Sequence, residues 1–215
     1  MTFHFPELFM AATIVLAFPA VAAAQTITFA EAAVGSTPKD FEYGLTGGGT
    51  AVKWAIVADP TASGGKALAQ TSQDRTDYHF PLAIYAPTLP PNVEVTIRFK
   101  PTAGDVDQAG GVIVRLVDSN NYYIARANAL EDNIRFYRVV DGNRQQLGSA
   151  NVKVKSGEWR TLTLRALGDR FTVSSDGAEL FAVSDKTFPG PGRAGLWTKS
   201  DSVTSFDRLE IKTLP

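Results

Sequence analysis

The segment "NNYYIARANALEDNIRFYRVVDGNR", residues 120–144, decides the fold class. It holds two runs of alternating side chains, 121–127 and 133–140, joined by the polar "NALEDN", and it ends near Asp141-Gly142. Alternation with a period of two is typical of a β-strand. An Asp-Gly pair between two such runs indicates a hairpin closed by a type I′ turn. The segment therefore predicts consecutive antiparallel strands.

Runs of the same kind fill the rest of the chain. The clearest is "VEVTIRFK" (93–100), and a second Asp-Gly pair, Asp176-Gly177, separates two later runs. Further predicted strands are 26–31, 51–58, 66–71, 77–85, 110–117, 144–148, 158–167, 170–175, 178–184, 193–198 and 206–213. No long stretch keeps a helical period, so the sequence predicts an all-β fold of two packed antiparallel sheets, a jelly roll or a related sandwich. The segments 35–50, with its "TGGGT", and 87–92 are predicted loops.

The turns fix the strand register, and the register assigns each side chain to a face of the sheet. The expected cross-strand pairs are Val140 with Asn143, Val139 with Arg144, Tyr137 with Gln146, Val117 with Tyr122, Arg115 with Ile124, Ile113 with Arg126, Arg126 with Arg135, Ile124 with Tyr137 and Tyr122 with Val139. One face is then apolar and predicts the core: Val112, Val114, Leu116, Tyr123, Ala125, Ala127, Ile134, Phe136 and Leu147, with Arg138 as its discordant member.

The opposite face mixes arginines and tyrosines with aliphatic side chains. Its candidate ligand-binding residues are Arg115, Tyr122, Arg126, Arg135 and Tyr137. Guanidinium groups bond hydroxyls or carboxylates and ring faces stack on C–H surfaces, which is the chemistry that binds a sugar. The alternative is a solvated sheet face, on which arginines pair with acids such as Glu131 or Asp132. Arg126 opposite Arg135 is a like-charge pair, so it requires an acidic partner or an anionic ligand.

Three segments carry a family resemblance: "GGVIVRLVDSNNYYIARANALEDNIRFYRVVDG" (110–142), "GEWRTLTLRALGDRFTVSSDGAELFAVSDKTF" (157–188) and "GRAGLWTKSDSVTSFDRLEI" (192–211). They resemble the concanavalin A-like jelly-roll family of lectins and glucanases. Among its members they are most similar to the LamG-like bacterial domains grouped as DUF1080, or 3-keto-disaccharide hydrolase domains, sometimes described as glycoside hydrolase family 16-like. The resemblance covers residues 26–213 and implies two curved sheets with a carbohydrate-facing concave side.

The catalytic signatures of such relatives are not found in this chain. Where an E-x-Q segment is expected the sequence has "VIVRLV", and the E-x-D-x-E pattern of family 16 glycosidases is absent. Retaining hydrolysis needs two carboxyl groups about 5 Å apart. The sequence therefore favours a carbohydrate-binding, lectin-like module whose partner is a glycan or glycoconjugate. A glycoside-cleaving enzyme of the DUF1080 type and a non-catalytic scaffold or protein-interaction domain are the alternatives.

The first 24 residues predict a secretory signal peptide, followed by one domain over residues 25–215. The stretch "LFMAATIVLAFPAVAAAQ" is apolar and ends in small residues, with an A-x-A cleavage site at 22–24. The segment before it lacks Lys and Arg and carries Glu7, which is unusual for a signal peptide. An N-terminal membrane anchor is the alternative, although the run is slightly short for a span. We expect an exported protein, periplasmic or extracellular, with no membrane span after cleavage.

Composition excludes several classes of function. The chain has no cysteine, so disulfides and thiolate chemistry are excluded. Without Glu7 the acidic and basic residues number 21 each, which gives no charge field to attract nucleic acid. After cleavage His79 is the one histidine, and its alternation with Tyr78 and Phe80 indicates a strand residue rather than a catalytic base.

Two more residues have competing interpretations. Asp207 shares the parity of Leu209 and Ile211, so its carboxylate points to the buried side. It predicts either a structural calcium site, with Glu31, Asp40 or Glu42 as further ligands, or a carboxylate that accepts backbone amides. Trp197 either stacks on a ligand or, as we favour for a Trp in a sandwich, belongs to the core.

Overall fold

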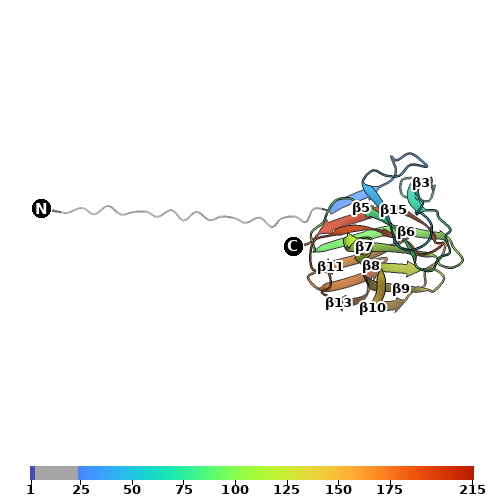
Figure 1. Cartoon of the computed structure of the whole chain (residues 1–215). Helices are drawn as coiled ribbons and strands as arrows, with labels where there is room; N and C mark the ends of the chain where they lie inside the picture. The colour runs from blue at the N-terminus through green and yellow to red at the C-terminus, as the bar shows by residue number, and fades with distance from the viewer. Residues whose placement is uncertain (3–23) are drawn as a thin grey trace.

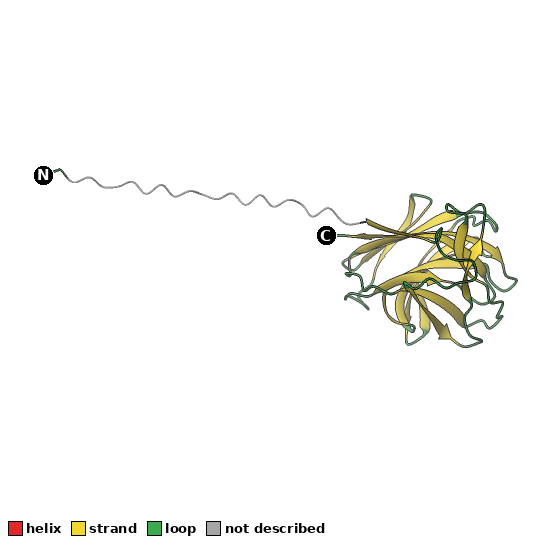
Figure 2. Ribbon diagram, turned by 90° about the horizontal axis from the view of Figure 1, so that it is seen from above, coloured by secondary structure: helices red, strands yellow, loops and turns green. Residues whose placement is uncertain are grey.

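The computed structural model describes residues 1–2 and 24–215. The predicted signal peptide lies almost entirely outside these residues. Within them the chain forms strands and loops only (Figure 2), and none of them belongs to a helix long and apolar enough to cross a bilayer. The strands are β1 Ala24–Thr28, β2 Phe41–Gly47, β3 Trp54–Ala58, β4 Lys66–Gln70, β5 His79–Tyr85, β6 Val93–Ala103, β7 Ala109–Asp118, β8 Asn121–Asn128, β9 Asn133–Val140, β10 Asn143–Asn151, β11 Arg160–Leu167, β12 Arg170–Ser175, β13 Ala178–Ser184, β14 Arg193–Trp197 and β15 Val203–Thr213.

The strands form two antiparallel sheets that pack face to face. The eight-stranded sheet has the order β13-β12-β11-β6-β15-β4-β3, with β1 also paired to β15. The seven-stranded sheet has the order β10-β9-β8-β7-β14-β5-β2. The first strand therefore lies beside the last, blue against red in Figure 1. This is the two-sheet sandwich that the strand pattern predicts.

The two Asp-Gly pairs close hairpins as predicted. Asp141 and Gly142 have φ of 48° and 77° and join β9 to β10, and Asp176 and Gly177 have φ of 49° and 82° and join β12 to β13. Positive φ at both central positions defines the type I′ turn. The predicted pairs across β8, β9 and the start of β10 are confirmed, including Arg126 opposite Arg135.

One strand was not predicted. Each predicted run overlaps an observed strand, but the segment 35–50, predicted to be a loop, contains β2. Phe41 and Tyr43 of β2 pack on the main core, so their alternation was a real strand signal. The glycines at 44 and 47–49 obscured it, since glycine is depleted in strands.

The main core lies between the sheets. It contains the predicted core residues Val112, Val114, Tyr123, Ala125, Ala127, Ile134 and Phe136, with Leu147 packed against them. Leu116 is the exception, because it belongs to a second hydrophobic cluster on the other face of the seven-stranded sheet. The members of this second cluster are Phe80, Leu82, Ile84, Ala109, Ile113, Leu116, Tyr122, Ile124, Tyr137, Val139 and Trp197, all buried.

The seven-stranded sheet curls around this second cluster. Strands β2 and β8 are four positions apart in the sheet, which would separate them by roughly 19 Å if it were flat. Instead Thr46 on β2 and Tyr122 on β8 share a hydrogen bond of 2.8 Å between their hydroxyl oxygens. A Cβ on Gly44 would come within 2.7 Å of Ser119 Oγ in the β7–β8 turn. The concave face of the sheet is therefore filled by its own side chains.

A bulge in β7 overturns the predicted place of Arg115. This residue has φ of 49°, and the pairing of β7 with β8 shifts between Val114 and Asp118. Ile113 consequently pairs with Ile124 instead of Arg126. The shift turns Leu116 to the concave face, and Arg115 leaves that face. Strict alternation was the wrong assumption here, because a bulge inserts residues that the partner strand does not match.

Candidate functional site

Four of the five predicted ligand-binding residues, Tyr122, Arg126, Arg135 and Tyr137, lie on the concave face of the seven-stranded sheet. The two tyrosines are buried there. Tyr122 bonds Thr46, and burial raises its pKa to about 12, so the hydroxyl stays protonated at neutral pH. The middle of the concave face is thus a second core rather than an open surface, and only the rim of the face remains accessible.

Arg126 is buried at this rim and is held by three groups. Its guanidinium donates to Asn133 Oδ1 at 2.7 Å and to Glu131 Oε2 at 2.8 Å, and its Nη2 lies 3.5 Å from the hydroxyl of Tyr137. Arg135, beside it, approaches the same Glu131 oxygen at 3.4 Å and is 35% exposed. Glu131 is therefore the acidic partner that the facing arginines required, as the solvated-face interpretation expected.

A second set of bonded charges adjoins Glu131. Asn128, at the end of β8, donates to Glu131 and to Asp107, and Asp107 also pairs with Lys199 at 2.7 Å. Lys199 reaches Asp77 as well, at 2.8 Å. Although burial alone would lower it, the hydrogen bonds to Asp107 and Asp77 raise the pKa of Lys199. Lys199 in turn lowers the pKa of Asp77.

Arg144 also belongs to this set and lies on β10, the edge strand of the seven-stranded sheet. It is the second residue of β10, and its guanidinium carbon lies 4.6 Å from the ring centroid of Tyr137, 4.8 Å from that of Phe80 and 5.9 Å from that of Trp197. Its Nη1 is buried without a hydrogen-bond partner among the described residues. We call the group formed by these polar side chains the rim cluster: Asp77, Asp107, Arg126, Asn128, Glu131, Arg135, Arg144 and Lys199.

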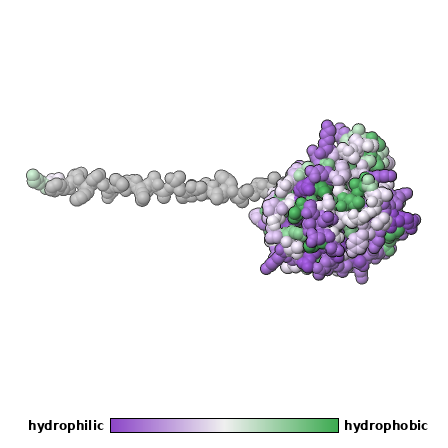
Figure 3. Space-filling view, in the orientation of Figure 1, coloured by the Kyte–Doolittle hydropathy of each residue, from purple (hydrophilic) through white to green (hydrophobic). Residues whose placement is uncertain are grey.

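Exposed hydrophobic side chains flank the rim cluster. Tyr78, Val106 and Leu130 are exposed, and each directly precedes or follows a carboxylate of the cluster in sequence. Tyr78 is 49% exposed, and its ring packs on Phe80 with the ring centroids 5.4 Å apart. Most of the surface seen in Figure 3 is hydrophilic, with smaller hydrophobic patches. The rim therefore presents apolar surface beside fixed hydrogen-bonding groups.

Glu131 is ionised by its surroundings. Burial opposes this, but hydrogen bonds from Arg126 and Asn133 and the charges of Arg126 and Arg135 lower its pKa to about 2. A general acid that protonates a glycosidic oxygen needs a raised pKa. Glu131 is thus suited to accept hydrogen bonds and unsuited to donate a proton at neutral pH.

Arg115, the fifth predicted residue, lies away from the rim. Its guanidinium donates to the carbonyls of Pro91, Gly168 and Phe188 at 2.9, 2.6 and 3.0 Å, and it stacks on Phe171. It lines a pocket of about 600 Å³ with Pro91, Gly168 and Lys186 among the other walls. Each of its three guanidinium nitrogens donates to a loop carbonyl, so Arg115 ties loops together at this edge.

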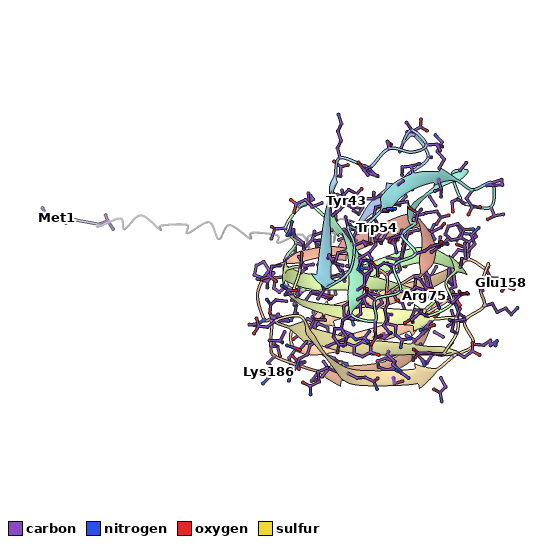
Figure 4. The ribbon with its side chains drawn as sticks, turned by 45° about the vertical axis from the view of Figure 1, so that its right-hand side comes forward. Met1, Tyr43, Trp54, Arg75, Glu158 and Lys186 are labelled. Atoms are coloured by element: carbon purple, nitrogen blue, oxygen red, sulfur yellow. The ribbon has the colours of Figure 1, made fainter. Side chains whose placement is uncertain are left out.

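Smaller pockets lie elsewhere. One of about 290 Å³ is lined by Trp159 and Glu158, and one of about 270 Å³ by Arg75 and Asp201. Figure 4 shows Arg75 and Glu158 on one side of the molecule and Lys186 on the other. Of the five predicted ligand-binding residues, Arg115 alone belongs to any of these three pockets.

Asp207 is buried and held by protein groups. Its Oδ2 accepts the amide N–H of Ser63 at 2.7 Å and pairs with Arg98, while Oδ1 has no described partner. Residues 24–215 contain no cluster of three or more acidic or histidine side chains that could hold a metal. The backbone amide agrees with one of the two sequence interpretations, and calcium at Asp207 stays a prediction.

Trp197 and His79 are both buried. Trp197 belongs to the second hydrophobic cluster, as the core interpretation predicted. His79 begins β5, and its Nδ1 lies 2.7 Å from the carbonyl oxygen of Gly48.

Sequence reasoning missed several residues of the rim. Asp107 and Lys199 lie just outside strands, so no alternation assigns them to a face. Asp77 and Tyr78 were predicted to belong to the strand 77–85, whereas both precede β5. Arg144 was placed on the correct face by its predicted pairing with Val139, which is confirmed. Its contact with Phe80, 64 positions earlier in the sequence, could not be foreseen from local pattern.

Comparisons with known proteins show the fold. No family model matches the chain. No curated protein sequence matches it either. Among solved structures, the carbohydrate-binding module CBM66 from Bacillus subtilis is 21% identical, with a TM-score of 0.61 over 77% of this chain and 91% of that one.

Two further solved structures are similar. The exoplasmic/lumenal domain of VIP36, in a Ca²⁺/Man-bound form, is 11% identical, with a TM-score of 0.58 over 83% of this chain and 84% of that one. A β-1,3-1,4-glucanase (lichenase) derived from a mouse hindgut metagenome is 10% identical, with a TM-score of 0.55 over 89% and 99%. The chain therefore has the concanavalin A-like jelly-roll fold, which binding modules, lectins and glycosidases share.

Proposed function

We propose that this protein is an exported carbohydrate-binding module and that it binds glycan at the rim cluster. Its fold resembles those of a carbohydrate-binding module and of the VIP36 exoplasmic/lumenal domain in its Ca²⁺/Man-bound form, although likeness at this level of identity fixes the architecture and not the ligand. The choice of function therefore rests on the site. Export rests on the apolar N-terminal segment, which ends where β1 begins.

The observation that carries this proposal is the half-exposed Tyr78 ring beside the fixed polar groups of the rim. A sugar presents C–H faces, which stack on aromatic rings, and hydroxyls, which bond charged and amide groups. Tyr78 supplies an aromatic ring for the C–H face. Arg135 and Glu131, both partly exposed, supply charged groups for the hydroxyls. The ion pairs hold these groups in place before the ligand arrives, which limits the entropy lost on binding.

The filled concave face restricts how the glycan binds. Tyr122, Ile124 and Val139 are fully buried, so the ligand cannot lie along the middle of the sheet without displacing them. The partly exposed polar groups of the face lie at its rim, with Arg135 and Glu131 near the β8–β9 loop and Arg144 near the start of β10. The site is therefore expected to contact a short stretch or a terminal unit of a glycan.

The test begins with the chain produced in an exporting host with its own N-terminal segment. Mass spectrometry of the recovered protein should give an N-terminus at Gln25. A glycan array followed by calorimetry then identifies a ligand and its Kd. Recovery of an uncleaved chain from the membrane fraction would favour the anchor over the signal peptide.

Variants locate the site. Tyr78→Ala should weaken binding by about 3- to 10-fold, the value of an aromatic contact, while Tyr78→Phe retains it. Arg135→Ala should weaken it by roughly 10-fold. Arg165→Ala is the matched control, because Arg165 is similarly exposed on the other sheet, where it faces Glu94 at 3.7 Å. If no glycan binds, or if Tyr78→Ala and Arg135→Ala behave like the control, the proposal fails.

An enzyme of the 3-keto-disaccharide hydrolase type is the second candidate, because the structure brings carboxylates together. Asp107 and Glu131 both accept a hydrogen bond from Asn128. Against it, Glu131 is ionised, and Lys199 bonds Asp107. Membership of that family stays a prediction. Release of free sugar from a bound glycan by the parent chain, abolished in Asp107→Asn, would replace the binding function with catalysis.

A further inference from the structure

Arg144 is the cation of the rim cluster whose charge is left unpaired. The cluster has four cations, Arg126, Arg135, Arg144 and Lys199, and three carboxylates. Glu131 pairs with Arg126 and Arg135, and Lys199 pairs with Asp77 and Asp107. Within residues 24–215, Arg144 forms neither an ion pair nor a side-chain hydrogen bond. The rim cluster therefore carries one excess positive charge, and among the described residues Arg144 is the cation of the cluster that has no ion pair.

The aromatic rings hold this charge in a fixed place. Phe80 and Tyr137 lie under the guanidinium at 4.8 and 4.6 Å, and the negative faces of the rings attract the cation. Rings cannot accept the in-plane N–H bonds of a guanidinium, so Arg144 keeps its hydrogen-bonding capacity. Its Nη1 is already buried without a partner. A partly buried cation in this state gains from an anion that completes its bonding.

Asp77, on which the charge of Arg144 acts, does not serve as that anion. Asp77 experiences the charge of Arg144, which contributes to the lowering of its pKa, but its carboxylate bonds Lys199. Arg144 itself is partly exposed, so an external group can approach its open edge. The exposed Tyr78 ring packs on Phe80, the same ring on which Arg144 lies. A bound sugar that stacks on Tyr78 would therefore have its substituents close to Arg144.

We propose that the glycan bound at the rim cluster is acidic and that its anionic group, a carboxylate or a sulfate, pairs with Arg144. This inference rests on the proposed carbohydrate-binding function and adds the chemical class of the ligand. Arg144 is then the residue that distinguishes an acidic sugar from its neutral counterpart. Arg135 and Tyr78 contact acidic and neutral sugars alike.

The experiment compares three ligands by calorimetry on the protein as recovered: a uronic-acid oligosaccharide, the same oligosaccharide with its carboxyl groups reduced to alcohols, and a sulfated oligosaccharide. We expect the parent to bind at least one anionic ligand roughly 10-fold more tightly than the reduced one. This preference should shrink as salt concentration rises.

Three variants test whether Arg144 causes the preference for the anionic ligand. Arg144→Gln should bring the ratio of the two affinities close to 1, because it weakens binding of the anionic ligand more than binding of the reduced ligand. Arg144→Lys, which keeps the charge but loses the planar fork, should retain part of the preference. Arg165→Gln is the control and should leave the ratio unchanged. Thermal midpoints of all variants confirm that the fold is intact.

The outcomes separate this inference from the proposed function. Equal binding of acidic and reduced ligands by the parent, or a preference that survives in Arg144→Gln, overturns the inference and leaves carbohydrate binding in place. Binding of the sulfated ligand alone supports the inference with sulfate as the anion, and binding of the uronate alone supports it with carboxylate. No binding of any saccharide, on the array or here, overturns both.

Discussion

Replacing Glu131 by Gln should destabilise the fold at neutral pH and leave it unchanged in strong acid. Glu131 joins Arg126 to Arg135, and its pKa falls from 4.5 to about 2 in the folded chain. A carboxylate whose pKa is lower in the folded than in the unfolded state contributes stability above its unfolded value. That contribution is lost as the pH falls toward the folded value. The relevant window is therefore about pH 4.5 down to pH 2.

The size of the effect follows from the same two pKa values. Their difference of about 2.5 corresponds to an upper bound of about 3.4 kcal/mol. Glu131 is 38% exposed, however, and water screens an exposed pair, so we reduce the expected loss to roughly 1–2 kcal/mol. For a domain of this size that lowers the thermal midpoint by roughly 2–8 °C.

The assay is urea unfolding of the parent and of Glu131→Gln at several values between pH 7 and pH 2.5. The difference in free energy of unfolding should be largest above pH 5 and should decline steadily below it. Glu158→Gln is the control, because Glu158 and its partner Lys155 are both about 60% exposed and should contribute less than about 0.5 kcal/mol at any pH. A Glu131→Gln difference that stays constant across this range would refute the assignment of Glu131 as the ionised link between the arginines.

Two further predictions concern the buried charges outside the rim. Arg115→Met removes the donor to three loop carbonyls and should cost about 2–3 kcal/mol in urea unfolding; a loss below about 0.5 kcal/mol would show that water replaces the guanidinium. Asp207→Asn leaves Arg98 without its counter-charge and should cost about 1–3 kcal/mol, whereas an unchanged midpoint would contradict the ion pair. Calcium added to the parent and to Asp207→Asn tests the metal hypothesis. If calcium binds at Asp207, it should raise the thermal midpoint of the parent and not that of the variant.

The parts of the fold that were predicted correctly depend on local sequence. Asp141-Gly142 and Asp176-Gly177 adopt positive φ whatever lies far away, so each fixes a hairpin and the register on both sides of it. Arg144 was therefore placed opposite Val139 from the turn alone, whereas Arg126 was placed opposite Arg135 by centring the "NALEDN" loop between its two strands. By contrast, Arg115 adopts positive φ without being Gly, Asn or Asp, and a bulge of that kind leaves no sign in the sequence.

The site could be predicted only in part because it depends on the curvature of the sheet. The sequence placed Arg126, Arg135 and Tyr137 on one face correctly, but it gave no information on how far that face is open. The positions of Arg144 over Phe80 and of Thr46 beside Tyr122 result from contacts between residues more than 60 apart in sequence. Contacts of this length are set by the whole sheet rather than by any segment.

One signal on the same face did point to burial. Ile113, Ile124 and Val139 share the face of the predicted ligand residues, and a solvated or ligand-binding sheet face is not expected to carry an aliphatic residue on each of three adjacent strands. Such a face buries its centre whether or not it also carries arginines. Polar groups on such a face can contact a ligand only at the strand ends, where the curled sheet no longer covers them. For this chain that argument moves the proposed binding surface from Tyr122 in the middle to Glu131, Arg135 and Arg144 at the rim.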